Sequence, residues 1–496
     1  MKKMFFAALA ATMMFASCNK DDIKIDIEGD GEGTKMGLSF TLPIASEARN
    51  SEYGAGDGVD IDAIGLESDI QSIQVFVFNA NGTLPANGAV SSFSITDFDH
   101  DGSGTYSLKE ANRIQTTAGS KYIYVAANIP TLPAVSSVYD LQTAIESAGW
   151  NSVTNEWGIP STGFVMCSPQ VSQTLVPQEE NTIDTTADPE NIVKTTLERT
   201  VAKLVVTSKT LVGKIQQDFP SYTQIDGTPV GLKMDYEIQD WGAGAVAKSY
   251  FIAQNHLSNP TPGVISTPNS NRTSIIGGPS SGARINKTVT PIMSAPIWKD
   301  MASFSYIGEN RPDGMLYGEA TTVMIRTQAE PTHVAILNAS NDIEWVTATG
   351  VNALTNGTFY LVRNEVAGAF FCKSTADVSA ITSKLPGTIT RTKSWEYDEG
   401  YAYFMVTVNI SAVPDATYKA VVYRNQFINI HITGIIDDYF GAIPGIPGSP
   451  EDPEDPEGEV PDPFDPEEPI IEDNAYLLVE VSAAPWVFYG EDVILK

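Results

Sequence analysis

Short runs with the composition of β-strands recur along the whole of this 496-residue chain. Two examples are Gln74–Phe78 and Lys121–Asn128, which are rich in β-branched and aromatic residues and end beside Asn, Gly or Pro. One helix is predicted, at Val138–Ala148, where Leu141, Ala144 and Ile145 share a face. Further strands are predicted at 201–206, 231–239, 321–327, 359–363, 402–410, 418–423 and 427–432. Many short strands and few helices predict an all-β protein made of β-sandwich domains.

Two segments of biased composition suggest how the chain is divided. Residues 256–292 are rich in Ser, Pro, Gly and Asn, so we expect a boundary near 250 between one domain at 50–250 and another at 251–496. Residues 441–469 contain nine prolines among acidic residues, which favours an extended loop. This loop tethers the final segment, 474–496, to the second domain.

The first residues have the pattern of an export signal. Lys2 and Lys3 precede an apolar run that ends in Ala16-Ser17-Cys18, which is too short to span a membrane as a helix. The small residues before Cys18 resemble a bacterial lipobox, although Phe15 stands where leucine is usual. We therefore predict a signal peptide at 1–17 and lipidation of Cys18.

A strict period of two follows this signal. The apolar residues alternate with small or polar ones between Thr34 and Ile44, and they are Met36, Leu38, Phe40, Leu42 and Ile44. This pattern predicts a strand with one buried face. The polar, Gly-rich stretch after it contains Arg49-Asn50 in a position that favours an exposed, protease-accessible loop. Local sequence alone favours a first strand followed by an ordinary linker.

The last segment has a similar alternation. Leu477, Val479 and Val481 alternate with Leu478, Glu480 and Ser482. Trp486 follows. Such a strand can pair within its own domain, or it can extend to another molecule and occupy a vacant strand position.

The charge of the chain argues against two kinds of partner. The formal net charge is −31 and the pI is about 4.3, which disfavours nucleic acid and anionic membrane surfaces. No motif of a hydrolase, metalloprotease or phosphate-binding loop is present, and the four histidines have no metal-ligand spacing. We predict neither an enzyme nor a bound cofactor.

Two weaker signals have ordinary structural explanations. Asp97–Gly102 matches the first half of a calcium-binding EF-hand loop, but Leu108 occupies the twelfth position, so a polar turn is the favoured interpretation. Cys167 and Cys372 stand beside large apolar residues and are predicted to be buried free thiols, with a single bridge between them as the alternative.

Five sequence motifs carry a resemblance to a known family. They are Gln74–Leu84, Lys121–Pro130, Leu197–Val206, Tyr306–Asn310 and Tyr423–Ile432. Together with the lipobox and the closing strand, they resemble the Bacteroidales fimbrillins, the FimA-type major fimbrial subunits or type V pilins. The resemblance covers almost the whole chain.

The resemblance implies two transthyretin-like Greek-key β-sandwich domains and a route of maturation. A lipidated outer-membrane precursor would be cut by an Arg-specific protease after Arg49, so that 18–49 is a propeptide and Asn50 the new first residue. Loss of the first strand would open a groove, which the C-terminal strand of another copy fills through Leu477, Val479, Val481 and Trp486. The implied partners are other copies of the chain and accessory anchor and tip subunits in a cell-surface fimbrium.

Two alternatives remain at this stage. The first is a tip or anchor subunit of the same system. The second is a surface glycan-binding lipoprotein, which needs an aromatic platform for sugars; Trp150, Trp157 and Trp395 are candidates, although packing is the default role for each.

Overall fold

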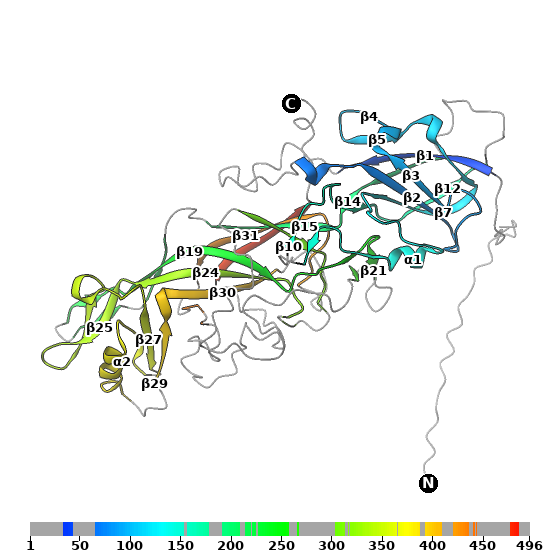
Figure 1. Cartoon of the computed structure of the whole chain (residues 1–496). Helices are drawn as coiled ribbons and strands as arrows, with labels where there is room; N and C mark the ends of the chain where they lie inside the picture. Colours follow the sequence, from blue (N-terminus) through cyan, green and yellow to red (C-terminus); the bar gives the residue numbers. More distant parts are fainter. Residues whose placement is uncertain are drawn as a thin grey trace, which may run out of the picture.

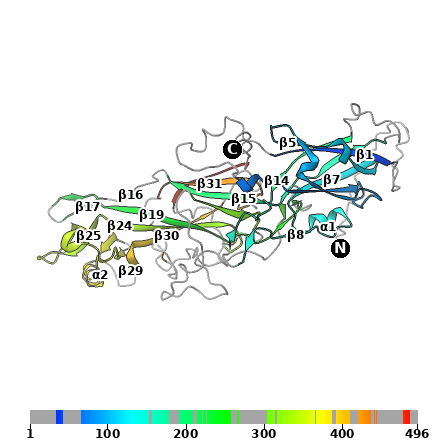
Figure 2. The same cartoon turned by 45° about the horizontal axis from the view of Figure 1, so that its top comes forward.

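The computed structural model describes an elongated molecule with strands along its whole length (Figures 1 and 2). The described residues are 33–42, 65–152, 156–177, 191–208, 214–219, 221–224, 227–256, 265–266, 303–312, 316, 318–364, 366–386, 392–408, 420–435, 440–441, 443 and 477–485. One end is formed by strands from the first 200 residues and the other by strands from 333 to 397 (Figure 1).

Two sheets form the N-terminal sandwich. The first has the order β13-β1-β5-β4, with β6 also paired to β1. Its strands are β1 (Gly33–Thr41), β4 (Phe98–His100), β5 (Thr105–Leu108), β6 (Ile114–Thr117) and β13 (Ile192–Thr196). The second has the order β14-β11-β7-β2-β3, with β12 paired to β7. Its strands are β2 (Ser72–Asn79), β3 (Val90–Ser94), β7 (Gly119–Ala127), β11 (Met166–Cys167), β12 (Val171–Leu175) and β14 (Glu198–Arg199). Phe93 of β3 and Phe98 of β4 meet between the sheets, with ring centroids 6.0 Å apart.

Two further sheets make up the middle of the molecule. One has the order β32-β31-β15-β23-β10-β9 and the other β16-β19-β24-β30. The first contains β9 (Trp150–Asn151), β10 (Glu156–Trp157), β15 (Val201–Ser208), β23 (Phe304–Gly308), β31 (Gln426–Ile435) and β32 (Leu477–Pro485). The second contains β16 (Lys214–Asp218), β19 (Lys233–Gly244), β24 (Thr322–Pro331) and β30 (Tyr401–Thr407). The two sheets touch where β16 meets β31 and where β30 meets β32.

The far end of the molecule is closed by small sheets around an aromatic cluster. These are β28-β27-β29, from β27 (Phe359–Asn364), β28 (Gly368–Cys372) and β29 (Thr392–Tyr397), and the hairpin of β25 (His333–Leu337) and β26 (Ile343–Thr347). Trp345 stacks on Phe370 at 5.8 Å, and Phe440 stacks on Phe219 at 5.1 Å. Because these side chains come from segments far apart in sequence, the cluster joins them into one core.

The remaining elements are short. Three strand pairs are β8 (Ile145–Glu146) with β20 (Tyr250–Phe251), β17 (Tyr222–Thr223) with β18 (Pro229–Val230), and β21 (Asn255–His256) with β22 (Ile265–Ser266). The helices are α1 (Val138–Gln142), α2 (Thr375–Thr382) and the 3-10 turns η2 (Gly65–Ser68), η3 (Ile95–Asp97), η4 (Glu110–Asn112), η6 (Gly350–Asn352) and η8 (Asp398–Gly400). The prediction of an all-β sandwich fold with few short helices is confirmed.

Several expected elements differ in extent. The helix predicted at Val138–Ala148 ends at Gln142, and Ile145 lies instead in β8, where its side chain is 58% exposed. The strand predicted at 418–423 is reduced, within the described residues, to an isolated bridge between Val422 and Asn310. Helix α2 was not expected.

The sheets do not divide at residue 250. Strand β15 pairs with β31 and β23, and β19 pairs with β24, so strands on both sides of 250 share sheets. Strands before Thr200 pair mainly with one another in the N-terminal sandwich. We therefore propose a domain boundary near 200 rather than near 250.

Candidate assembly interface

Strand β1 occupies an interior position in the first sheet (Figure 1). On one side it pairs in parallel with β13, from Gly37 opposite Ile192 to Thr41 opposite Thr196. On the other side it pairs antiparallel with β6 over its first half and with β5 over its second. A strand bonded on both sides cannot leave without exposing two rows of backbone N–H and C=O groups.

The period-two face of β1 is buried as the sequence predicts. Met36 and Phe40 are fully buried, and Leu38 and Leu42 nearly so. Phe40 packs edge-on against Phe98 and stacks on Tyr106, each at 5.2 Å between ring centroids. At roughly 1.5–3 kcal/mol for each buried large apolar side chain, this face contributes about 6–12 kcal/mol. Ile44, the fifth predicted member, lies outside the described residues.

The C-terminal strand lies at an edge of a different sheet. β32 pairs antiparallel with β31, from Leu477 opposite Ile435 to Pro485 opposite Gln426, with a register shift between Ile432 and Gly434. Val479 and Val481 lie within this ladder, whereas Trp486 falls outside the described residues. Only β31 borders β32 among the described strands, so fewer backbone bonds hold this strand than hold β1.

The processing residues cannot be placed. Cys18, Arg49 and Asn50 all lie outside the described residues, so lipidation and cleavage stay predictions.

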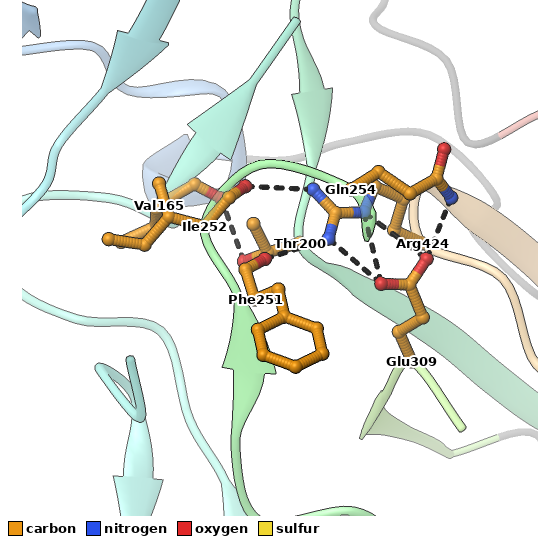
Figure 3. Close-up of polar contacts among 7 residues, drawn as sticks. All are labelled: Val165, Thr200, Phe251, Ile252, Gln254, Glu309 and Arg424. Carbon is orange, nitrogen blue, oxygen red and sulfur yellow. Dashed lines mark hydrogen bonds and ion pairs between the residues drawn. The ribbon is translucent and has the colours of Figure 1, made fainter. Parts of the chain in front are cut away.

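Three of the sequence motifs lie together where the N-terminal sandwich meets the middle sheets. They are Leu197–Val206, Tyr306–Asn310 and Tyr423–Ile432. Figure 3 shows the buried pair of Arg424 and Glu309, with 2.8 Å between Nη2 and Oε2. The same guanidinium donates to the backbone carbonyls of Phe251 and Ile252, at 2.8 and 3.0 Å (Figure 3). Gln254 donates to the other oxygen of Glu309 at 2.8 Å (Figure 3). The charges are thus paired and hydrogen-bonded, which is the condition for burying them.

A second buried ion pair lies at the same junction. Lys203 of β15 is 3.1 Å from the carboxylate of Glu67 in η2, and both side chains are fully buried. The hydroxyl of Tyr306 donates to the same oxygen of Glu67, Oε1. Burial, together with this carboxylate, raises the pKa of Tyr306. The backbone carbonyl of Glu67 accepts a bond of 2.9 Å from Arg199.

Arg199 joins the two halves of the molecule directly. It belongs to β14 of the N-terminal sandwich, and it donates to the side chain of Asn425, just before β31, at 3.2 Å. Burial lowers the pKa of Arg199 to about 9, although Glu67 acts in the opposite direction. Gly308 has a steric role here, because a Cβ at this position would lie 2.6 Å from the carbonyl oxygen of Ala247. We infer that these motifs hold the two halves together.

Two of the three aspartates in the calcium-like segment, Asp97 and Asp101, bond to nearby protein groups. Asp97 accepts bonds from the backbone N–H of Ser94 and the side chain of Asn112. Asp101 accepts from the N–H groups of Ser103 and Thr105, at 2.8 and 3.1 Å. Bonds from Ser103, followed by Thr105, lower the pKa of Asp101 to about 2. Among the described residues, no three His, Cys, Asp or Glu side chains gather to hold a metal ion.

Cysteine and tryptophan side chains serve packing. Cys167 and Cys372 are free and buried, as predicted, and burial raises the pKa of each thiol to about 12. Trp157 and Trp395 are buried, and Trp157 packs edge-on against Trp150 at 5.6 Å. The three tryptophans therefore offer no exposed aromatic platform for a sugar.

No helix in the described part of the chain is long and apolar enough to cross a membrane.

Comparison with known proteins finds one family model that matches part of the chain. Residues 36–202 match the model of the major fimbrial subunit protein (FimA), so this segment of the chain is similar to that family of fimbrial subunits. No curated protein matches the sequence.

Among solved structures, three similar chains carry fimbrial descriptions. A fimbrilin (fimA) from Porphyromonas gingivalis W83 is 15% identical, with 91% of this chain and 98% of that chain covered and a TM-score of 0.41. The tip fimbrial protein Mfa3 from Porphyromonas gingivalis, with a C-terminal truncation, is 14% identical, with 82% and 96% covered and a TM-score of 0.33. A fimbrial assembly protein from Parabacteroides distasonis ATCC 8503 is 15% identical, with 63% and 94% covered and a TM-score of 0.29. The similarity to fimbrial subunits used below is the sequence match at 36–202.

Proposed function

We propose that this protein is a structural subunit of a cell-surface fimbrium with a role in adhesion, and that it polymerises head to tail by strand exchange. The observation that carries the proposal is β1, a short strand whose inner face is apolar from Met36 to Phe40, placed between partners on both sides. Its removal would leave an apolar groove and two unpaired strand edges, a state that favours capture of another strand.

The C-terminal strand is the proposed donor. β32 has nine residues, as β1 does, and its residues Leu477, Val479 and Val481 repeat at the same period of two. Among the strands that the structure describes, it pairs with one and β1 pairs with three, so fewer backbone bonds must break before it can leave its own sheet. A donor from one copy and a groove on the next make a heterologous contact, which generates a filament.

Maturation supplies the trigger in this scheme. The precursor is lipidated at Cys18, carried to the outer membrane and cut between Arg49 and Asn50 by an Arg-specific protease. The membrane is a partner through lipid only until the cut. The filament would also contain anchor and tip subunits.

The test is intact-mass and N-terminal analysis of surface filaments, with and without an Arg-specific protease. Subunits in polymers should begin at Asn50; polymers whose subunits still begin at lipidated Cys18 would refute the scheme. Deleting residues 474–496 should abolish polymerisation while far-ultraviolet circular dichroism keeps its β signature. A matched control carries Arg49→Lys, which should stay uncut and monomeric. A protein that remains lipidated and uncut at the base of filaments would be an anchor subunit instead.

A further inference from the structure

The buried face of β1 begins with a polar residue. Thr34 precedes Met36 on the inward face and is only 5% exposed. It is the Cα partner of Thr116 on β6, another buried threonine. A hydroxyl in such a place must be hydrogen-bonded to be tolerated.

A closed set of hydrogen bonds surrounds this hydroxyl. Thr34 Oγ1 donates to the backbone carbonyl of Val176 at 2.7 Å and accepts from Asn191 Nδ2 at 3.0 Å. Asn191 also bonds to both backbone groups of Val176, its Oδ1 accepting from the N–H at 2.9 Å and its Nδ2 donating to the carbonyl at 3.0 Å. The Val176 N–H fixes which end of the amide is oxygen, so the second Nδ2 hydrogen is directed at Thr34.

Asn191 does not belong to β1, so removing β1 would take the Thr34 hydroxyl away from its amide. Asn191 is 2% exposed and stands immediately before β13, the parallel neighbour of β1. Without a hydroxyl at the position of Thr34, one buried N–H would lose its acceptor. Leaving a buried donor unpaired costs about 1–3 kcal/mol, or roughly a factor of 5 to 150 in an equilibrium.

The C-terminal strand brings no hydroxyl on its apolar face. The odd-numbered positions of β32 are Leu477, Val479, Val481, Ala483 and Pro485. The other face contains Ser482, but turning it inward would also bury Glu480, whose charge makes that orientation costly. Whichever odd-numbered residue of β32 meets Asn191, it offers no hydrogen-bond partner from its side chain.

We propose that Thr34, Asn191 and the Val176 carbonyl form a hydroxyl-binding subsite that favours β1 over the C-terminal strand as occupant of this place in the sheet. The proposal rests on the strand exchange proposed above. Thr34 then acts as a retention residue: an uncut precursor keeps its own strand, and exchange waits for the cut. The hydroxyl of Thr34 thus favours β1 over the C-terminal strand, whereas the apolar surface of the groove can bind the apolar face of either strand.

The test uses the full-length, uncut chain and a dye-labelled synthetic peptide of residues 477–485, followed by fluorescence anisotropy. Thr34→Val should bind about tenfold more peptide than the wild type at equal concentration. Thr34→Ser keeps the hydroxyl and should behave as the wild type. Thr41→Val is the matched control, because it makes the same change on the same strand where the hydroxyl lies 3.5 Å from the Thr195 carbonyl, beyond a good hydrogen bond.

The outcomes separate the two proposals. Equal peptide binding by Thr34→Val and Thr41→Val would overturn the subsite, as would increased binding by Thr34→Ser. In a parallel arm, each protein is cut with an Arg-specific protease and its polymers are sized by light scattering. If all cut proteins polymerise but the peptide arm shows no difference, strand exchange stands and the subsite falls. If the cut wild type forms no polymer, the proposed function itself fails.

Discussion

Replacing Phe40 by alanine tests whether β1 is a full member of the N-terminal core. The ring is fully buried and has aromatic neighbours on two sides, Phe98 and Tyr106, each at 5.2 Å. Phenylalanine-to-alanine changes in protein cores cost about 3–5 kcal/mol, because apolar contact is lost and a cavity remains. The two aromatic contacts place this site toward the upper part of that range.

The assay is urea denaturation of the uncut chain, followed by tryptophan fluorescence and by circular dichroism. Ser39→Ala is the control, because its hydroxyl meets Ser107 at 3.3 Å in an exposed position and its loss should cost less than about 1 kcal/mol. A loss below about 1 kcal/mol for Phe40→Ala would refute the reasoning, since β1 would then contribute little to the core. After cleavage and loss of β1, residue 40 is no longer part of the folded chain, so the variant and the wild type should have the same free energy of unfolding.

Three further predictions concern a buried ion pair, the two buried thiols and the hydrogen-bonded carboxylate of Asp101. Arg424→Met should lower the free energy of unfolding by about 3–5 kcal/mol, because it leaves the Glu309 carboxylate buried and unpaired, whereas the double variant with Glu309→Leu should recover most of that loss in the same urea assay. Cys167 and Cys372 should resist alkylation at pH 8 in the native protein and react in urea, as read by peptide mass spectrometry, because both thiols are buried with pKa values of about 12. The pKa of Asp101 lies at about 2 in the folded chain against 3.8 ordinarily, so its ionised form stabilises the fold above pH 4 and this contribution is lost as the pH falls toward 2. Asp101→Asn should therefore show a weaker decline in stability between pH 4 and 2 than the wild type, and an unchanged decline would contradict the assignment.

Periodicity located the two strands that matter most for assembly. The alternation at 34–44 corresponds to β1, because a strand with one buried face shows that burial at every second residue. The alternation at 477–481 lies within β32. The partners of these strands could not be read in the same way. β1 meets β13 through residues more than 150 positions away, and nothing in either segment specifies that pairing.

The helical prediction failed where tertiary pairing overrode local preference. Leu141 is buried on α1 as expected, but the carbonyl of Ala144 accepts the N–H of Ile252, and Ile145 pairs with Phe251 in a two-residue ladder. Helix α2 had a usable signal that was missed: Ser374 caps the N–H of Asp377 three residues later.

The ionic junction could not be predicted from the sequence. Lys203 and Glu67 are 136 residues apart and Arg424 and Glu309 are 115 apart, and charged side chains are normally assigned to the surface.

The parallel ladder between β15 and β31 also constrains how the chain can fold. Its members are separated by more than 200 residues, as in the bond between Thr207 and Asn429, which spans 222 positions. Contacts of such long range close slowly, since a large loop must be ordered before any bond forms. During synthesis the N-terminal sandwich can assemble once residue 199 has emerged, but the pairing of β15 with β31 must wait for residue 435. The chain therefore spends much of its synthesis with β15 unpaired on one side, and that exposed edge is where we expect misassembly between nascent copies to begin.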